Sequence, residues 1–201
     1  MKVLIINTYD TGGAANACIR LHQGLLNQKI DSNLLLLHKT KDLQNSHQFN
    51  RKKPKSLPFF LKMKRGLANT LNISKPKLSE EELFLRQRER SLEMYSFPNS
   101  NHNITQSKLY QEADIINLHW VAGFLDFESF FKKNTKPVVW TLHDMNPFLG
   151  GEHYKEINHG ITSLGTPRKR NISDVEKFLS RKNLKLKISV LSKVENLTIV
   201  S

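Results

Sequence analysis

The sequence predicts an α/β fold, a Rossmann-like parallel sheet with helices on both faces. Short apolar strands alternate with helical segments along most of the chain, and this order is typical of a parallel sheet covered on both sides. The strands are nearly continuous apolar runs, as in residues 2–6 and 34–37, which indicates burial on both faces. The length of 201 residues suits one such domain.

The first part of the chain predicts a strand, a helix and a second strand. The strands cover residues 1–7 and 31–38, and the helix between them opens at residues 11–15 and runs to about residue 28. Residues 39–56 are polar and basic without a sustained period, so we expect a loop there.

The middle of the chain predicts short helices. We expect helices at residues 58–72 and 79–91, the second opened by a capping box of Ser79 and Glu82. A further short helix should cover residues 106–112, after an extended segment.

The last part of the chain returns to alternating strands and helices, with a loop at residues 152–172. The final helix should begin after a capping Ser173, with Glu176 at its third position. The predicted elements are strand 114–119, helix 124–131, strand 137–142, helix 173–186 and strand 196–201.

Two neighbouring strands end in histidine. His119 and Trp120 follow the first, and His143 and Asp144 follow the second. One crossover helix separates these strands, so they should be adjacent, with both histidines facing one crevice at the carboxyl edge of the sheet. Simpler interpretations remain open: either histidine bonds only to loop backbone, and Asp144 only caps the turn that Pro147 continues.

A glycine pair follows the first strand. Gly12 and Gly13 allow close backbone approach, the helix that follows offers free N–H groups to a phosphate or diphosphate, and Thr11 adds a hydroxyl. The alternative is a tight turn without a ligand. A nicotinamide site is disfavoured, because the loop lacks a Gly-x-Gly-x-x-Gly pattern and the second strand ends at His38 without an acidic residue.

The net charge of +13 is concentrated in a basic insertion at about residues 43–79. No acidic residue occurs between Asp42 and Glu80. Large apolar residues accompany the cations, which favours an anionic membrane surface over a plain solvated face and, above all, over nucleic acid. The residues expected at the membrane are Lys52, Lys53, Lys62, Lys64 and Arg65.

The cysteine count and the lengths of the apolar runs indicate in which cellular compartment the protein is found. Cys18 is the single cysteine, so no internal disulfide forms, and we expect it to be a small buried residue in a reducing cytosol. No signal-peptide pattern opens the chain, and no apolar run reaches the roughly 18 residues of a spanning helix. We expect a cytoplasmic protein with peripheral association at the inner face of the cytoplasmic membrane.

The glycine pair, the INLHW sequence at residues 116–120 and VVWTLHDMNPFLGGEHY at residues 138–154 occur in an order that resembles one family. It is the amino-terminal domain of bacterial GT-B glycosyltransferases of family 4, in the branch that builds colanic-acid-type and other surface polysaccharides. The resemblance covers most of the chain. Relatives often carry a cluster of cysteines after the His-Tyr pair, whereas residues 155–160 contain none.

The resemblance implies the acceptor-side lobe of a retaining enzyme that transfers a sugar from a nucleotide-sugar donor to a lipid-linked surface glycan. It implies that His143 contacts the transferred sugar, and it implies no cofactor or metal. It also implies a second, donor-binding lobe that is not among these residues, so we expect the fragment alone to be inactive. The alternative is a non-catalytic basic module or split subunit that docks on a membrane or partner.

A metal site at Glu152, His153 and His159 is not expected. The three residues lack a helix-compatible ligand pair, and histidine-rich loops without one are usually solvated.

Overall fold

The computed structural model describes residues 1–50, 78–155 and 157–201. The chain divides into two compact units, one of Met1–Phe49 with Glu89–Ser201 and one of Asn50–Arg88. The helix expected at residues 58–72 lies outside the described residues. So do the cations expected at a membrane, Lys52, Lys53, Lys62, Lys64 and Arg65.

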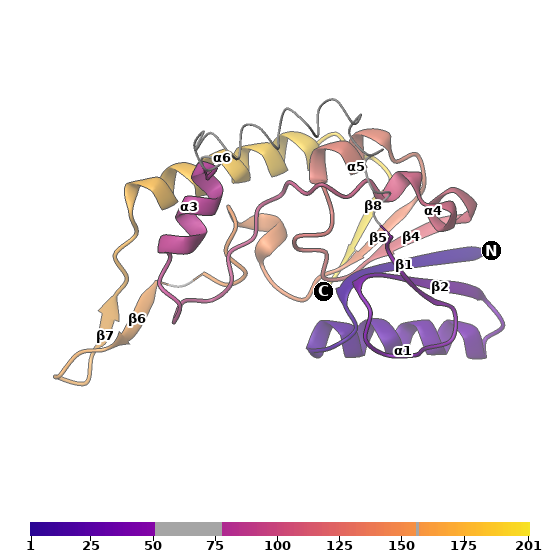
Figure 1. Cartoon of the computed structure of the whole chain (residues 1–201), viewed down its shortest axis with the longest axis horizontal. Coiled ribbons are helices and arrows are strands. Elements are labelled where there is room, and N and C mark those ends of the chain that lie inside the picture. The colour runs from indigo at the N-terminus through magenta and orange to yellow at the C-terminus, as the bar shows by residue number, and fades with distance from the viewer. Residues whose placement is uncertain (51–77, 156) are drawn as a thin grey trace, which may run out of the picture. The chain divides into compact units, whose positions relative to one another are not determined.

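The larger unit contains a six-stranded sheet in which every neighbouring pair of strands is parallel (Figure 1). The strand order is β3-β2-β1-β4-β5-β8. The bounds are β1 (Lys2–Tyr9), β2 (Asp31–His38), β3 (Ser46–Gln48), β4 (Ile115–Leu118), β5 (Val138–Thr141) and β8 (Leu197–Val200). The predicted parallel α/β fold is confirmed.

Helices cover both faces of this sheet, as Figure 1 shows. The side chains of β1 alternate between the two: Val3 and Ile5 pack with Cys18 of α1, whereas Leu4 and Ile6 belong to the larger core on the opposite face. Cys18 is buried, as predicted. The helices are α1 (Gly13–Asn27) on one face and α4 (Lys108–Glu112), α5 (Phe127–Lys133) and α6 (Asp174–Leu191) on the other.

The strand order places a switch point at the centre of the sheet. The chain leaves β1 for β2 and β3 on one side, and then returns to β4 on the other side of β1. At such a point the connections that leave the carboxyl ends of adjacent strands diverge, and the crevice between them is the usual ligand site of open α/β sheets.

Two segments predicted as loop contain strands. Strand β3 pairs with β2 at the edge of the sheet. Its three residues are polar, so the sequence has no apolar run from which this strand could be predicted. The segment 152–172 contains an antiparallel hairpin of β6 (Asn158–Ile161) and β7 (Pro167–Lys169). Both strands are short, β7 is exposed throughout, and Gly165 in the connecting turn has φ 76°. The segment lacks the alternation of apolar and polar residues that would indicate strands.

Two predicted helices have different bounds in the structure. Helix α5 begins at Phe127 rather than at residue 124, because the Asp126 carboxylate caps it by accepting from the Ser129 N–H at 2.9 Å. Helix α6 has the predicted Ser173 cap but continues to Leu191, five residues beyond the predicted end at 186.

The smaller unit is described only at residues 50 and 78–88. It contains α3 (Glu80–Gln87), and the predicted capping box of Ser79 and Glu82 is present. The helix ends four residues before the predicted residue 91. Among the helices that the structure describes, none combines the length and the apolar character needed to cross a bilayer.

Candidate functional site

A cleft of about 570 Å³ opens at the switch point. This volume is in the range of small-molecule sites, about 300–1,000 Å³. Its walls come from the end of β1, the start of α1, the ends of β4 and β5, and segments near residues 94 and 154.

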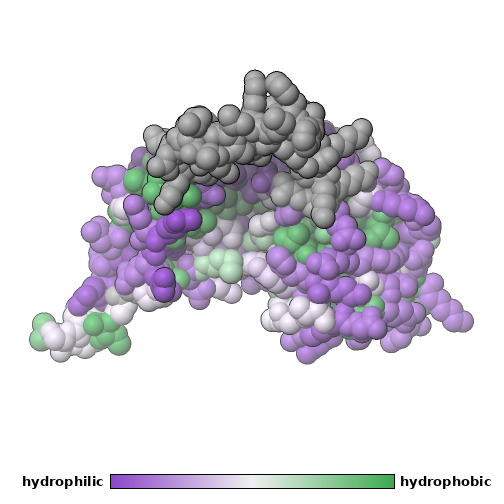
Figure 2. All heavy atoms as spheres, in the orientation of Figure 1, coloured by the Kyte–Doolittle hydropathy of each residue, from purple (hydrophilic) through white to green (hydrophobic). Residues whose placement is uncertain are grey.

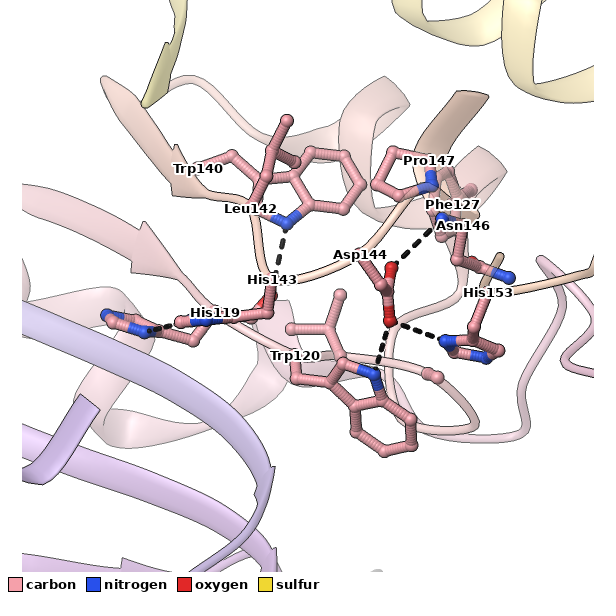
Figure 3. Close-up of a pocket in the computed structure, with 12 residues that line it drawn as sticks. His119, Trp120, Phe127, Trp140, Leu142, His143, Asp144, Asn146, Pro147 and His153 are labelled. Atoms are coloured by element: carbon pink, nitrogen blue, oxygen red, sulfur yellow. Dashed lines mark hydrogen bonds and ion pairs between the residues drawn. The ribbon is translucent and has the colours of Figure 1, made fainter. Parts of the chain in front are cut away.

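The structure brings almost all of the residues predicted at the glycine loop and the two strand ends into this one cleft. Its lining includes Thr11, Gly12, Gly13, Trp120, His143 and Asp144. His119 lies behind them and lines a smaller adjoining pocket, which it shares with Trp120, His143 and Asp144 (Figure 3). The predicted crevice between the two strand ends is therefore present.

The loop between β1 and α1 presents backbone to the cleft. Gly12 is the N-cap residue at φ 94°, a conformation that other residues rarely adopt, and no side chain in the described part of the chain caps the helix. Thr11 lines the cleft but does not cap. The first turn of α1, at Gly13 and Ala15, carries no acidic residue. The free N–H groups of this turn therefore favour an anion.

His119 and His143 form a stacked, hydrogen-bonded pair. Nδ1 of His119 lies 2.9 Å from Nε2 of His143, and the ring centroids are 5.1 Å apart. Burial, reinforced by the nearby His143, lowers the pKa of His119 to about 4. Burial also lowers the pKa of His143, although the negative charge of Asp144 opposes this shift. Both rings are therefore neutral at pH 7.

The environment of His119 selects one proton arrangement in the pair. Nε2 of His119 is buried and has no hydrogen-bond partner among the described residues. A buried N–H without an acceptor is rarer than a buried lone pair without a donor. The proton of His119 therefore belongs on Nδ1, which donates to Nε2 of His143, and His143 carries its own proton on Nδ1.

Asp144 accepts hydrogen bonds from three directions. Its Oδ2 accepts from Nε1 of Trp120 at 2.7 Å and from Nδ1 of His153 at 2.5 Å (Figure 3). Its Oδ1 accepts from the Asn146 N–H at 2.9 Å. Burial alone would raise the pKa of Asp144, but these hydrogen bonds hold it below its ordinary value. The carboxylate is ionised, caps the turn, which was one of its two predicted roles, and accepts from Trp120. No described hydrogen bond joins it to His143, so it acts on that ring through its charge.

His153 extends this network. Nδ1 of His153 donates to the Asp144 carboxylate, and Nε2 of the same ring lies 2.8 Å from the Ser96 hydroxyl oxygen, within hydrogen-bond distance. The ring packs against Trp120 with centroids 5.3 Å apart. The neighbouring Glu152 forms an ion pair with Arg170 at 2.5 Å. In the described part of the chain, no group of three or more His, Cys, Asp or Glu residues is placed to hold a metal ion.

Besides Ser96, two supporting residues escaped the sequence analysis. Asn7, at the end of β1, is buried, and its Oδ1 accepts from the backbone N–H of Trp120 at 2.8 Å. Lys187 of α6 is fully buried and donates to the carbonyls of Asn146 and Leu149, so it fixes the turn after Asp144. Burial lowers the pKa of Lys187 to about 8, although Asp144 opposes the shift.

The sequence contained a signal for one of the two. A polar residue at the end of an otherwise apolar strand is a candidate for a structural role at the sheet edge, and Asn7 fits that description. Lys187 carries no such signal, because lysines in an amphipathic helix are usually solvated.

Comparison of the chain with protein-family models, with curated proteins and with solved structures found no match.

Proposed function

We propose that this chain is the acceptor-side lobe of a retaining glycosyltransferase, which transfers a sugar from a nucleotide-sugar donor to a lipid-linked cell-surface glycan. The observation that carries the proposal is the cleft at the switch point. It combines an uncapped helix N-terminus with a neutral histidine pair and an ionised carboxylate. In this proposal a donor-binding lobe is supplied outside these 201 residues.

The helix terminus supplies the phosphate contact in this proposal. The first turn of α1 lines the cleft, and an ideal Cβ at Gly12 or Gly13 would meet no atom of the described residues within 4 Å, so the described part of the chain leaves this backbone open to a ligand. Free N–H groups and the helix dipole stabilise the negative charge that develops on a departing diphosphate.

His143 supplies the sugar contact. Its neutral state favours a hydrogen bond to a sugar hydroxyl over stabilisation of phosphate by an imidazolium. The pairing with His119 leaves the Nδ1–H of His143 as the donor. The ring is fixed in orientation and tautomer, so it can hold a sugar hydroxyl in place without rearranging. Holding reacting groups in the right geometry lowers the barrier of the reaction.

Asp144 acts as a positioning residue. Its carboxylate already accepts from Trp120, His153 and the backbone of Asn146, so it is poorly placed to take a proton from an acceptor hydroxyl. The donor phosphate is then the proton acceptor, and catalysis consists of positioning and electrostatic stabilisation.

Aromatic side chains offer a platform for a glycan. Trp120 lines the cleft together with Tyr9 and Tyr154, and the two tyrosines are exposed. Aromatic walls with a few fixed polar groups are typical of small-molecule sites. These aromatic walls support the binding of an uncharged ring, such as a sugar, beside the phosphate at the N-terminus of α1.

A genetic test works without identifying the donor. The native gene is deleted and restored as wild type, His143→Ala or the control His47→Ala, an exposed histidine of β3. Lipid-linked and surface glycans are compared by mass spectrometry. Deletion should shorten or remove one glycan, wild type and the control should restore it, and His143→Ala should fail although the protein is present.

The second candidate is a non-catalytic basic module that binds an anionic ligand in the same cleft. The net charge of +13 favours it. Unchanged glycans after deletion, or full restoration by His143→Ala, would support this module and contradict the transferase.

A further inference from the structure

The β6–β7 hairpin stands apart from the sheet of its unit. Its two strands pair with each other and with none of the six parallel strands. Ile161 is 70% exposed and Leu164, in the connecting turn, is 87% exposed. Figure 2 shows hydrophobic side chains gathered at the tip of this hairpin. An isolated two-stranded hairpin is only marginally stable in water, so its exposed aliphatic tip is costly to maintain without a partner.

The charge of the hairpin has one sign. The sequence contains no acidic residue from 157 to 173, and Arg168 and Lys169 are exposed. The segment also lacks Phe, Tyr and Trp. Aliphatic side chains beside exposed cations match a surface that is apolar below and anionic above. A nucleic acid would instead be served by aromatic stacking residues.

The base of the hairpin is held firmly. Arg170 is buried and forms ion pairs with Glu152 and Glu176, and its backbone N–H donates to the Ile157 carbonyl at 3.0 Å. These contacts tie the start of α6 to the loop before the hairpin. The tip is thus presented from a fixed base rather than from a free loop.

We propose that the hairpin tip inserts into the interfacial region of an anionic lipid membrane. Ile161 and Leu164 enter the acyl boundary, while Arg168 and Lys169 contact lipid phosphates. The proposal rests on the hairpin alone and is independent of the proposed transferase function. It adds a second membrane contact to the one expected for the basic insertion, with apolar insertion as its distinguishing property.

Insertion would bring the cleft to the membrane. The segment that leads into the hairpin contains His153 and Tyr154, which line the cleft. If the proposed function holds, a lipid-linked acceptor would meet the cleft while its lipid remains in the bilayer.

Fluorescence at the tip tests insertion directly. The full chain with Leu164→Cys is labelled with an environment-sensitive nitrobenzoxadiazole dye; the natural Cys18 is buried and should not react. Vesicles of phosphatidylglycerol and phosphatidylcholine should shift the emission to the blue and protect the dye from an aqueous quencher. Vesicles of phosphatidylcholine alone should do so far less. The matched control is Ile188→Cys, an exposed position on α6.

Binding to the same vesicles measures the contribution of the tip. Ile161→Ser with Leu164→Ser should lower the partition coefficient by roughly 100-fold, because fully burying one such side chain corresponds to about tenfold in affinity. Ile188→Ser should change it less than about threefold. Circular dichroism should show all variants folded.

Three outcomes would overturn the proposal. One is an unshifted dye on bound protein, which would mean that the chain adsorbs through the basic insertion alone. Another is an equal loss of binding in Ile188→Ser and in the tip variant. The third is the absence of vesicle binding while an acidic polypeptide protects the dye, which would identify a protein partner.

Discussion

At the scale of single residues, the site depends on titratable groups held in defined protonation states. Burial keeps His119 and His143 neutral, while three hydrogen-bond donors keep Asp144 charged. A neutral pair beside a carboxylate can present a fixed donor to an uncharged hydroxyl without placing an unpaired positive charge in the interior.

The state of His119 predicts an acid-sensitive stability. Its folded-state pKa of about 4 lies below the unfolded value of about 6.5, so the unfolded chain binds more protons between these values. The free energy of unfolding should therefore fall with decreasing pH, and this residue should contribute about 2 kcal/mol of the loss between pH 7.5 and pH 5. Urea unfolding of wild type and His119→Asn at both pH values measures it. Equal pH dependence in the two proteins would show that His119 is not buried in its neutral form.

The charge on Asp144 predicts a second effect on stability. Asp144→Asn places an amide against N–H donors and should lower the free energy of unfolding by about 2 kcal/mol. The control is Asp42→Asn, whose carboxylate is fully exposed and should matter by less than about 0.5 kcal/mol. Near-ultraviolet circular dichroism should also change for Asp144→Asn, because the amide has a single acceptor oxygen and cannot accept from both Nε1 of Trp120 and the Asn146 N–H as the carboxylate does. Wild-type stability and an unchanged spectrum would mean that the network does not form in solution.

The sequence predicted which residues lie at the site better than it predicted the hydrogen bonds between them. His119, His143 and Asp144 were recognisable because titratable residues at strand ends meet at one sheet edge. The bond of His153 to Asp144, and that of Ser96 to His153, were not, because both residues come from loops whose path is set by tertiary packing. Lys187 was hidden for the same reason: its burial depends on the turn that packs over it.

At the scale of elements, the loop that follows β5 packs closely against helix α6. Gly150 lies against α6: an added Cβ would come within 2.3 Å of the Ser180 carbonyl oxygen and 2.5 Å of its Cα. These are backbone atoms of a long helix, so moving them away would cost much more free energy than moving the end of a flexible side chain. Gly151 likewise allows a close approach, with the Tyr95 ring 2.3 Å from the position of an added Cβ.

This contact predicts opposite effects of two glycine substitutions. Gly150→Ala should destabilise the protein by about 3 kcal/mol through overpacking. Gly24→Ala, inside α1 with nothing near its Cβ, should stabilise it by roughly 0.5–1 kcal/mol through helix propensity. Thermal unfolding of both variants tests the pair. A neutral Gly150→Ala would mean that the loop and α6 are further apart than described.

The elements that the sequence predicted well are those with a strong apolar signal. Strands β1, β2, β4 and β5 are short apolar runs in a buried sheet, and the Ser79 and Ser173 caps have a local chemical cause. Strand β3 and the hairpin lack such runs, because an edge strand and an exposed hairpin bury little surface. Their pairing depends on neighbours that a local pattern does not show.

At the scale of the whole molecule, topology explains why residues far apart in the sequence meet. The return of the chain from β3 to β4 opens the crevice between the ends of β1 and β4. The Thr11–Ala15 segment enters from one side of that crevice and His143 from the other. A helix N-terminus and a neutral imidazole at one switch point fit a ligand with an anionic group and a hydroxylated ring.

The most direct test of this arrangement is a titration of the ¹⁵N-labelled protein followed by NMR, with inorganic diphosphate and a panel of nucleoside diphosphate sugars. We predict saturable shifts of the Gly13, Ala14 and Ala15 amides, tighter binding of one sugar nucleotide than of diphosphate, and loss of that difference in His143→Ala. Gly13→Val, which fills the cleft, should abolish the shifts, whereas Gly24→Val should not. Shifts confined to other surfaces, or binding that survives Gly13→Val, would contradict the assignment of the cleft.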